Sequence, residues 1–453
     1  MEFLKKKILV VGFGKSGLSA ARWLSKEGAS VTIGDIKKEA DLNQEILKDA
    51  LALGVKLETG GHRGETFIHS DMIIVSPGVP LDIAPLKAAG ERGIPIIGEM
   101  GLAAGMFDTP IVAVTGTNGK STTVSLLESM IKGSGARLFV GGNIGTPLMD
   151  YVAGDQDADY VLVEVSSFQL DTMERFCPEV SLLLNISPDH LDRYPDYEAY
   201  VRSKLKIFQN QGPGHYAILN DDDERLSRFQ PTGGVSVLRY GMEKRDRLNA
   251  FLDDNRLIAH LSGEETHYFD TEKFRLPGRH NIENLMGSVL AGLALRLDPD
   301  IIMDSITGFK GLPHRVELIK SIDGIDFYDD SKATNVDAAL KSIKSFDRPV
   351  ILIAGGRHKG GDYRPLIVAA EGRVKKAILI GEARELMARS FQGVIPFSLA
   401  DSMGDAVSQA FSSAGGNDAV LLAPACSSFD MFSDYAHRGR IFREEIEGLN
   451  NVD

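Results

Sequence analysis

Residues 111–123 read IVAVTGTNGKSTT, and this stretch decides the fold. Residues 111–114 are apolar and mostly β-branched, which is typical of a buried strand. A turn with two glycines follows, and an apolar helical pattern then extends from Lys120 to about Ile131. A strand, a glycine-rich turn and a helix in this order predict a phosphate-binding loop in a parallel α/β domain.

The turn carries the groups that hold a nucleoside triphosphate. Its backbone amides can point inward, Lys120 supplies a compact positive charge, and the Ser121 hydroxyl can ligate Mg²⁺. Val114 stands where the general G-x-x-x-x-G-K-[ST] pattern has its first glycine, so the loop is a variant of that pattern. ATP is the expected nucleotide, and the candidate ATP-binding residues are Gly116, Thr117, Asn118, Gly119, Lys120, Ser121, Thr122 and Thr123.

Apolar runs alternate with helical patterns along the 453 residues, as in parallel α/β sheets. The pattern restarts twice, so we expect three domains: a Rossmann-like domain over 1–98, a central P-loop-type ATPase domain with a mainly parallel sheet over 99–311, and a second Rossmann-like domain over 312–453. In the central domain, strands are expected at 160–165 and 180–186 and a helix at 198–208. The patchy, alternating pattern of residues 233–266 predicts a small antiparallel segment. The acidic run 221–224 is expected to be a solvated turn.

Composition excludes several classes of protein. The formal net charge of −13 argues against non-specific nucleic-acid binding, which needs a cationic surface. The two cysteines exclude a disulfide framework and a CxxC metal site, and they indicate a reducing compartment. Apolar runs such as 180–184 are far shorter than the ~20 residues that span a bilayer, so no membrane insertion is expected and the protein is predicted to be cytoplasmic.

A second glycine motif, Gly12-x-Gly14-x-x-Gly17, lies between an expected strand and helix near the N-terminus, and Asp35 ends the next strand. The glycines allow backbone N–H groups to approach a pyrophosphate, and the carboxylate suits a ribose hydroxyl. The motif indicates a nucleotide diphosphate without identifying it. An NAD-dependent oxidoreductase and a tight turn without a ligand both stay open at this point.

Metal-suitable groups follow two expected strands of the central domain. Glu164 ends one strand, and Asp189-His190 follows the other. Ligands of parallel sheets gather at the carboxyl ends of the strands, so these groups are expected to face the phosphate loop. A carboxylate, an imidazole and the Ser121 hydroxyl form a reasonable Mg²⁺ shell once phosphate oxygens complete it.

The order of motifs resembles that of the ATP-dependent Mur ligases. TGTNGKST is followed by GNIG (142–145), EVSSFQL (164–170), NISPDHLDRY (185–194), GRHNIEN (278–284), GLPHR (311–315) and DDSKATN (329–335). The resemblance covers essentially the whole chain. It implies an enzyme of peptidoglycan precursor synthesis that joins D-glutamate to UDP-N-acetylmuramoyl-L-alanine through an acyl phosphate, with ATP as the phosphoryl donor.

The same resemblance assigns the N-terminal glycines to the UDP part of the substrate instead of NAD. The residues that it implies for the UDP substrate are Gly14, Lys15, Ser16, Asp35, Gly78, Asn143, Ser166, Gln169 and His190. Those that it implies for ATP, beyond the loop, are His280, Asn281, Asn284, Arg315 and Asp330. Those that it implies for D-glutamate are Thr334, Lys359, Ser428, Phe429 and Tyr435, although Phe429 and Tyr435 depart from the side chains expected there.

Resemblance also singles out Lys204 as a lysine carboxylated by CO₂, whose carbamate oxygens would bind a metal ion. The implied metal ligands are Ser121, Glu164, His190 and the Lys204 carbamate, serving a pair of Mg²⁺ ions, and the implied catalytic residues are Lys120, Lys204, His190 and Lys332. Without the resemblance, Lys204 would be taken for a solvated helix residue, and Lys206 would be an equal candidate.

Alternatives of three kinds remain. Sister ligases add L-alanine, a diamino acid or a dipeptide, or extend folate with glutamate. The N-terminal GFGKSG weighs against the folate enzyme, and GGRHKGGD in place of a DNPR-like sequence weighs against the diamino-acid ligase. An NAD-dependent oxidoreductase leaves the phosphate loop unexplained, and a nucleotide-regulated switch would bind partners without forming an amide. The expected partners are the three small substrates, with no nucleic acid and with a monomeric chain.

Overall fold

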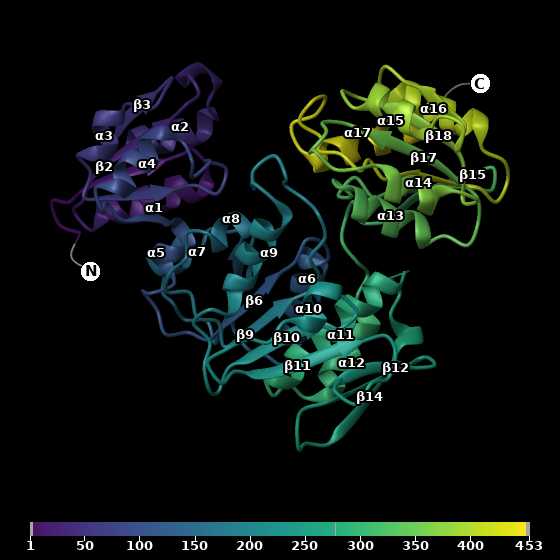
Figure 1. Ribbon diagram of the computed structural model, residues 1–453, viewed down its shortest axis with the longest axis horizontal. Helices are drawn as coiled ribbons and strands as arrows, with labels where there is room; N and C mark the ends of the chain where they lie inside the picture. The colour runs from purple at the N-terminus through teal and green to yellow at the C-terminus, as the bar shows by residue number, and fades with distance from the viewer. Residues whose placement is uncertain (1–2, 277, 450–453) are drawn as a thin grey trace.

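The computed structural model describes residues 3–276 and 278–449. It consists of three α/β domains in chain order, each built on one sheet, and the first and last domains stand apart on the same side of the central one (Figure 1). The three domains predicted from the sequence are confirmed. Within the described residues, no helix combines the length and hydropathy that a bilayer crossing requires.

The N-terminal domain has a parallel sheet in the order β3-β2-β1-β4-β5. Its strands are β1 (Lys7–Val11), β2 (Ser30–Asp35), β3 (Lys56–Thr59), β4 (Met72–Val75) and β5 (Ile96–Gly98), and its helices are α1 (Lys15–Lys26), α2 (Gln44–Ala52), α3 (Gly64–Ile68) and α4 (Ala84–Glu91), with a 3₁₀ turn at Glu39–Asp41. The glycine motif forms the turn between β1 and α1, as predicted, and so lies at the carboxyl edge of the sheet.

The central sheet has the order β14-β13-β12-β11-β10-β9-β6-β8-β7 and is parallel from β7 to β12. Its strands are β6 (Ile111–Thr115), β7 (Leu138–Gly142), β8 (Tyr160–Glu164), β9 (Val180–Leu183), β10 (Tyr216–Asn220), β11 (Ser236–Gly241), β12 (Ala250–Asp253), β13 (Arg256–His260) and β14 (Thr266–Asp270). Its helices are α5 (Glu99–Ala103), α6 (Lys120–Gly133), α7 (Leu148–Ala153), α8 (Ser167–Leu170), α9 (Tyr197–Leu205), α10 (Glu224–Arg228), α11 (Arg279–Ala294) and α12 (Pro299–Gly308), with 3₁₀ turns at Lys206–Phe208 and Thr271–Lys273.

Some expectations for the central domain are confirmed and others need correction. The antiparallel strands are β12, β13 and β14, so they lie at residues 250–270, later than the predicted 233–266, where β11 is still parallel to its neighbours. The phosphate loop lies between β6 and α6, as expected. β9 ends at Leu183, three residues earlier than predicted, and the helix predicted over 198–208 becomes a 3₁₀ turn after Leu205. The acidic run is not wholly solvated: Asp221 is only 3% exposed, because guanidinium groups of Arg239, Arg245 and Arg247 surround its carboxylate.

The C-terminal sheet has the order β15-β16-β20-β17-β18-β19, and only the β15–β16 pair is antiparallel. Its strands are β15 (Glu317–Ile322), β16 (Ile325–Asp329), β17 (Val350–Gly355), β18 (Val374–Ile380), β19 (Phe397–Leu399) and β20 (Ala419–Leu422). Its helices are α13 (Val336–Lys344), α14 (Arg364–Ala370), α15 (Arg384–Phe391), α16 (Met403–Ser413) and α17 (Tyr435–Gly448).

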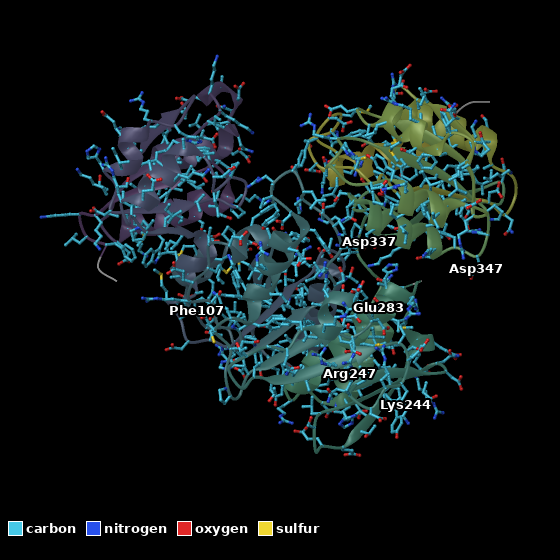
Figure 2. The ribbon with its side chains drawn as sticks, in the orientation of Figure 1. Phe107, Lys244, Arg247, Glu283, Asp337 and Asp347 are labelled. Atoms are coloured by element: carbon cyan, nitrogen blue, oxygen red, sulfur yellow. The ribbon has the colours of Figure 1, made fainter. Side chains whose placement is uncertain are left out.

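The C-terminal domain meets the central domain through polar side chains. Asp337, in the first turn of α13, accepts hydrogen bonds from Asn118 of the phosphate loop at 2.7 Å and from the Ser187 hydroxyl at 3.1 Å. Figure 2 labels Asp337 at the side of the C-terminal domain that faces the central domain. The neighbouring Asn335 amide donates to Asp189 at 3.0 Å, so α13 begins against two loops of the central domain.

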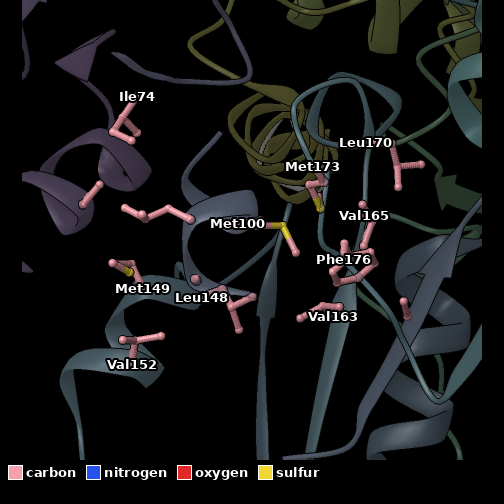
Figure 3. Packing of buried hydrophobic residues seen from close by; sticks show 14 of the residues in the cluster. Ile74, Met100, Leu148, Met149, Val152, Val163, Val165, Leu170, Met173 and Phe176 are labelled. Carbon is pink, nitrogen blue, oxygen red and sulfur yellow. The ribbon is translucent and has the colours of Figure 1, made fainter. Parts of the chain in front are cut away.

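The N-terminal domain is joined to the central domain differently, by a continuous apolar core. Helix α1 contacts α5 and α7, and one cluster of buried side chains extends from Ile74 in β4 through Met100 and Met149 to Val163 in β8. Figure 3 shows these four side chains in the region where the N-terminal domain meets the central domain. Among residues 3–276 and 278–449, the buried clusters of the C-terminal domain contain no residue of the other two domains.

Candidate functional site

A cavity of about 460 Å³ lies between the central and C-terminal domains. It gathers most of the residues predicted for ATP, metal and amino acid binding. Those that line it are Thr117, Asn118, Gly119, Lys120, Ser121, Thr122, Asn143, Glu164, Ser166, His190, Lys204, His280, Asn281, Asn284, Arg315, Asp330, Lys332, Thr334, Lys359, Ser428, Phe429 and Tyr435. Gly14, Lys15, Ser16, Asp35, Gly78, Gly116, Thr123 and Gln169 do not line it.

The phosphate loop ends at the first turn of α6. Gly119 has a φ of +89°, and a Cβ at this position would lie 2.3 Å from the Asn284 Oδ1 atom, so only glycine is accommodated. The Lys120 ammonium turns back on the loop and donates to the carbonyls of Gly116 and Thr117, each at 2.9 Å. Burial lowers the pKa of Lys120, and nearby Glu164 opposes that shift. An anion in the loop would offer this lysine a better partner than two neutral carbonyls.

Oxygen donors meet where β8 ends, beside the loop. The Ser121 hydroxyl donates to one Glu164 carboxylate oxygen at 2.8 Å, and the Asn143 amide donates to the other at 2.8 Å. Glu164 is 2% exposed. A hydroxyl and a carboxylate this close together form the kind of hard oxygen pair that Mg²⁺ accepts.

Lys204 is buried, so the reading of it as a solvated residue is wrong. It is 2% exposed, its ammonium donates to the Gly116 carbonyl at 2.9 Å, and it lies 4.9 Å from the centre of the Tyr200 ring. Burial, reinforced by the charge of Lys120, lowers the pKa of Lys204 well below its usual range. The competing candidate, Lys206, points away to an ion pair with Asp171 at 2.7 Å.

Asp189 and His190 line the same cavity. His190 takes a φ of +54°, and its ring packs edge-on against Phe168 with centroids 4.8 Å apart. Burial lowers the pKa of His190 to about 4, so the ring is neutral at pH 7 and can offer a nitrogen lone pair. Burial alone would raise the pKa of Asp189, but Lys359 and His190 outweigh it and hold that pKa low.

The C-terminal domain supplies cations and one carboxyl group with a raised pKa. The Lys332 ammonium lies 3.6 Å from the centre of the Tyr435 ring, and burial lowers its pKa to about 8. Burial raises the pKa of Asp330 to about 7, while a hydrogen bond from Ser342 opposes the rise. Phe429 lines the cavity but is 64% exposed.

A second cavity, of about 520 Å³, lies between the N-terminal and central domains. Its walls are residues 75–77 and 79–82 from the N-terminal domain and 168, 171–172 and 192–195 from the central domain. Arg193 joins the two sides, because its guanidinium donates to the Gly78 carbonyl at 3.1 Å and lies 4.7 Å from the centre of the Phe168 ring.

The glycine turn after β1 approaches this side of the molecule. Ser76 donates to the Gly12 carbonyl, and Gly12 has a φ of +101°. The Asp35 carboxylate accepts the backbone N–H groups of Phe13 at 2.7 Å and of Lys37 at 2.8 Å, so it stabilises the turn. Gln169 does not reach the first cavity because it closes the capping box of α8 with Ser166.

Sequence reasoning missed a set of polar residues at the start of α13. Asn335 belongs to the motif DDSKATN, yet its contacts with Asp189 and Asn118 depend on the approach of two domains. Lys341 also lines the first cavity and pairs with Asp337 at 3.0 Å. The one available signal was an Asn followed by an apolar helical pattern, which indicates a helix cap and nothing more.

Comparison with known proteins gives three consecutive domain matches. The model "Mur ligase MurD-like, N-terminal domain" matches residues 6–98, "Mur ligase middle domain" matches 114–292, and "Mur ligase, glutamate ligase domain" matches 314–426.

Similar proteins and structures agree with those matches. The UDP-N-acetylmuramoylalanine--D-glutamate ligase of Geotalea daltonii is 43% identical over 453 residues, covering 100% of both chains, and that of Desulfosudis oleivorans is 44% identical over 455 residues, covering 100% of this chain and 98% of the relative. The solved structure of UDP-N-acetylmuramate-alanine ligase MurC from Thermotoga maritima shares the fold, with a TM-score of 0.61 and 18% identity over 98% of this chain and 100% of that one. A pseudomurein peptide ligase type C from Methanothermus fervidus gives the same TM-score at 21% identity, again over 98% of this chain and 100% of that one.

Proposed function

The chain belongs to the Mur ligase family, and on that premise we propose that it joins D-glutamate to UDP-N-acetylmuramoyl-L-alanine in peptidoglycan precursor synthesis. Relatives at 41–44% identity carry this activity in their names, and the family resemblance predicted from the motifs is confirmed. The observation that carries the proposal is the cavity in which the phosphate loop of one domain faces Lys332, Thr334 and Lys359 of another.

The reaction needs two bond exchanges. An oxygen of the alanyl carboxylate attacks the γ-phosphorus of ATP, ADP leaves, and an acyl phosphate forms. The glutamate amine then attacks the acyl carbon, a proton is lost from nitrogen, and phosphate leaves as the amide forms. Two anions meet in the first exchange, so Lys120 and Lys332 have the task of offsetting negative charge where it develops.

The loop and its surroundings suit Mg²⁺. Ser121 and Glu164 supply adjacent oxygens, neutral His190 supplies a nitrogen, and a carbamate on Lys204 would supply further oxygens for a second ion. When bound, Mg²⁺ offsets the charge of the transferring phosphoryl group.

Carboxylation of Lys204 has a physical basis in its burial. Only the neutral amine adds CO₂, and the addition releases one proton and leaves a carbamate anion. The lowered pKa of Lys204 favours the neutral amine, and Lys120 is close enough to lower that pKa further. A carbamate would therefore remove a like-charge repulsion and place an anion beside Lys120.

The remaining assignments follow the domain order. Residues 1–98 bind the UDP moiety through Gly14, Lys15, Ser16, Asp35 and Gly78, residues 99–311 bind ATP, and residues 312–453 bind D-glutamate through Thr334, Lys359, Ser428, Phe429 and Tyr435. The cavity bridged by Arg193 supports the path of the muramoyl arm between the first two domains. The enzyme acts in the cytoplasm, where its nucleotide substrates are made, and as a monomer.

The test is ATP-dependent phosphate release with UDP-N-acetylmuramoyl-L-alanine as the acceptor. D-Glutamate, L-glutamate, L-alanine and a diamino acid are compared as the second substrate. A buried polar site built for one amino acid discriminates by ~10⁴ or more, so D-glutamate alone is expected to support release. Release with another amino acid, or no release with any, contradicts the proposal.

A further inference from the structure

Asp189 and Lys359 form an ion pair across the interface between the central and C-terminal domains. The Lys359 ammonium lies 3.6 Å from one Asp189 oxygen, and the Asn335 amide donates to the other oxygen at 3.0 Å. Their side chains are 7% and 21% exposed, and both line the reaction cavity. Buried charges of this kind must keep a partner whenever one of them is taken away.

The other acids of the cavity already have partners elsewhere. Glu164 accepts from Ser121 and Asn143 beside the phosphate loop, and Asp330 accepts from Ser342. Asp434 caps α17 by accepting the His437 backbone N–H. Among the acidic residues that line this cavity, Asp189 is thus the one whose charge partner is a lysine assigned to the amino acid substrate.

A zwitterionic amino acid can replace both members of this pair at once. One of its carboxylates takes the place of Asp189 at Lys359, and its ammonium takes the place of Lys359 at Asp189. No buried charge is left unpaired by this exchange, whereas a dicarboxylate without an amino group would satisfy Lys359 and leave Asp189 without a cation.

We infer that Asp189 binds the ammonium group of the incoming glutamate while Lys359 binds one of its carboxylates. The inference rests on the proposed function and adds a recognition element to it. Asp189 precedes His190 on the same loop, and both residues line the cavity that contains the phosphate loop, so this contact holds the nucleophilic nitrogen inside that cavity. The contact also rejects diacids that resemble glutamate in length and charge.

The test compares two ligands that differ only in the amino group. The full-length enzyme and Asp189→Asn are assayed for the KM of D-glutamate and for the inhibition constant of glutarate, which competes with D-glutamate and lacks the amine. Removing one partner of a buried charge pair weakens binding by about 30-fold or more. The KM of D-glutamate is expected to rise by that factor, whereas the glutarate constant is expected to stay the same or fall.

Equal weakening of both ligands would show that Asp189 acts only by holding Lys359 and the C-terminal domain, and it would overturn the inference. An unchanged KM for D-glutamate would overturn it as well. Asp362→Asn is the matched control, because Asp362 is an exposed acid three residues beyond Lys359 that pairs with Arg364 at 2.6 Å. It is expected to change neither constant.

Two further measurements separate the possible failures. If the unaltered enzyme releases no phosphate with D-glutamate, the proposed function fails before the inference is tested. If Asp189→Asn does not fold, as judged by its thermal unfolding, Asp189→Glu replaces it. That variant keeps the charge and is expected to retain a preference for D-glutamate over glutarate, and loss of the preference would contradict the inference.

Discussion

The two boundaries of the central domain are built on opposite principles. Toward the N-terminal domain, Met100 and Met149 are 1% and 0% exposed in a core that runs without interruption from one sheet to the other. Toward the C-terminal domain, contacts are hydrogen bonds and ion pairs such as Asn118–Asp337 and Asp189–Lys359. Buried apolar surfaces stay together because separating them would expose them to water, and a polar ligand cannot replace that contact. A hydrogen bond or an ion pair, in contrast, can be replaced by an equivalent bond to a ligand.

Under the proposed function, the apolar boundary serves substrate binding and the polar boundary serves the reaction. The cavity toward the N-terminal domain lies at the boundary that contains the continuous core, so its two sides are expected to keep a fixed spacing. A fixed spacing suits the binding of a large substrate. The cavity toward the C-terminal domain is lined by lysines and carboxylates. Under the proposed function, these charged groups are expected to exchange their present partners for the nucleotide and the amino acid. If the two boundaries act independently, substitutions at one of them should leave the other unaffected.

Lys120→Ala is expected to abolish turnover, by about 10³-fold or more, because the loop loses the charge that faces the phosphates. Binding of UDP-N-acetylmuramoyl-L-alanine at the other boundary is expected to stay nearly intact. Phosphate release and calorimetric binding of the UDP substrate measure the two effects. A comparable loss of both would mean that the boundaries do not act independently.

Lys204→Ala is expected to lower turnover by about 10²–10³-fold, because the site loses the oxygens proposed for a metal ion. A small added carboxylate should restore part of the activity by occupying the same space. Initial rates with and without acetate provide the measurement, and Lys206→Ala is the control on the same segment. Full activity of Lys204→Ala would contradict the carbamate assignment.

Met149→Ala is expected to destabilise the protein by about 2–5 kcal/mol, because it opens a void in the core shared by two domains. Asn335→Ala, at the polar boundary, removes hydrogen bonds worth roughly 1 kcal/mol each. Denaturant unfolding of both variants compares the boundaries directly. An equal loss of unfolding free energy in the two variants would contradict the proposed difference between an apolar and a polar boundary.

Glu99 makes the apolar boundary sensitive to pH. Its buried carboxyl accepts the Met149 backbone N–H, and burial raises its pKa to about 7. The folded protein therefore keeps a proton that the unfolded chain releases above about pH 4.5, so stability falls as the pH rises from there through 7, by roughly 3 kcal/mol at most. Glu99→Gln should remove this dependence, and its advantage in thermal midpoint over the unaltered protein should grow between pH 5 and pH 8. An advantage that does not change with pH would contradict this account.

Closure around bound ligands is the smallest expected effect. The domain boundaries near residues 98 and 311 are the expected hinges, and the continuous core across the first of these favours motion at the second. Small-angle scattering should show a modest decrease in the radius of gyration when an ATP analogue and the UDP substrate are both present. An unchanged scattering profile would contradict closure.

Much of the fold was predictable because its signals are local. The strand, glycine turn and helix around residues 111–131 are indicated by side chains that are neighbours in the chain, and the structure has them where they were expected. The buried state of Asp221 was not predictable in this way. Its arginine partners lie 18 to 26 residues further along the chain, and nothing in the acidic run itself indicates them.

The three α/β domains, the phosphate loop and the family could be predicted from the amino-acid sequence, because each depends on short motifs whose order is independent of packing. The burial of Lys204, the pairing of Asp189 with Lys359 and the different polarity of the two domain boundaries are visible only in the folded chain. Those properties arise when distant segments exclude water from one another, and the free energy of a charge depends on that exclusion more than on the residues beside it in the chain.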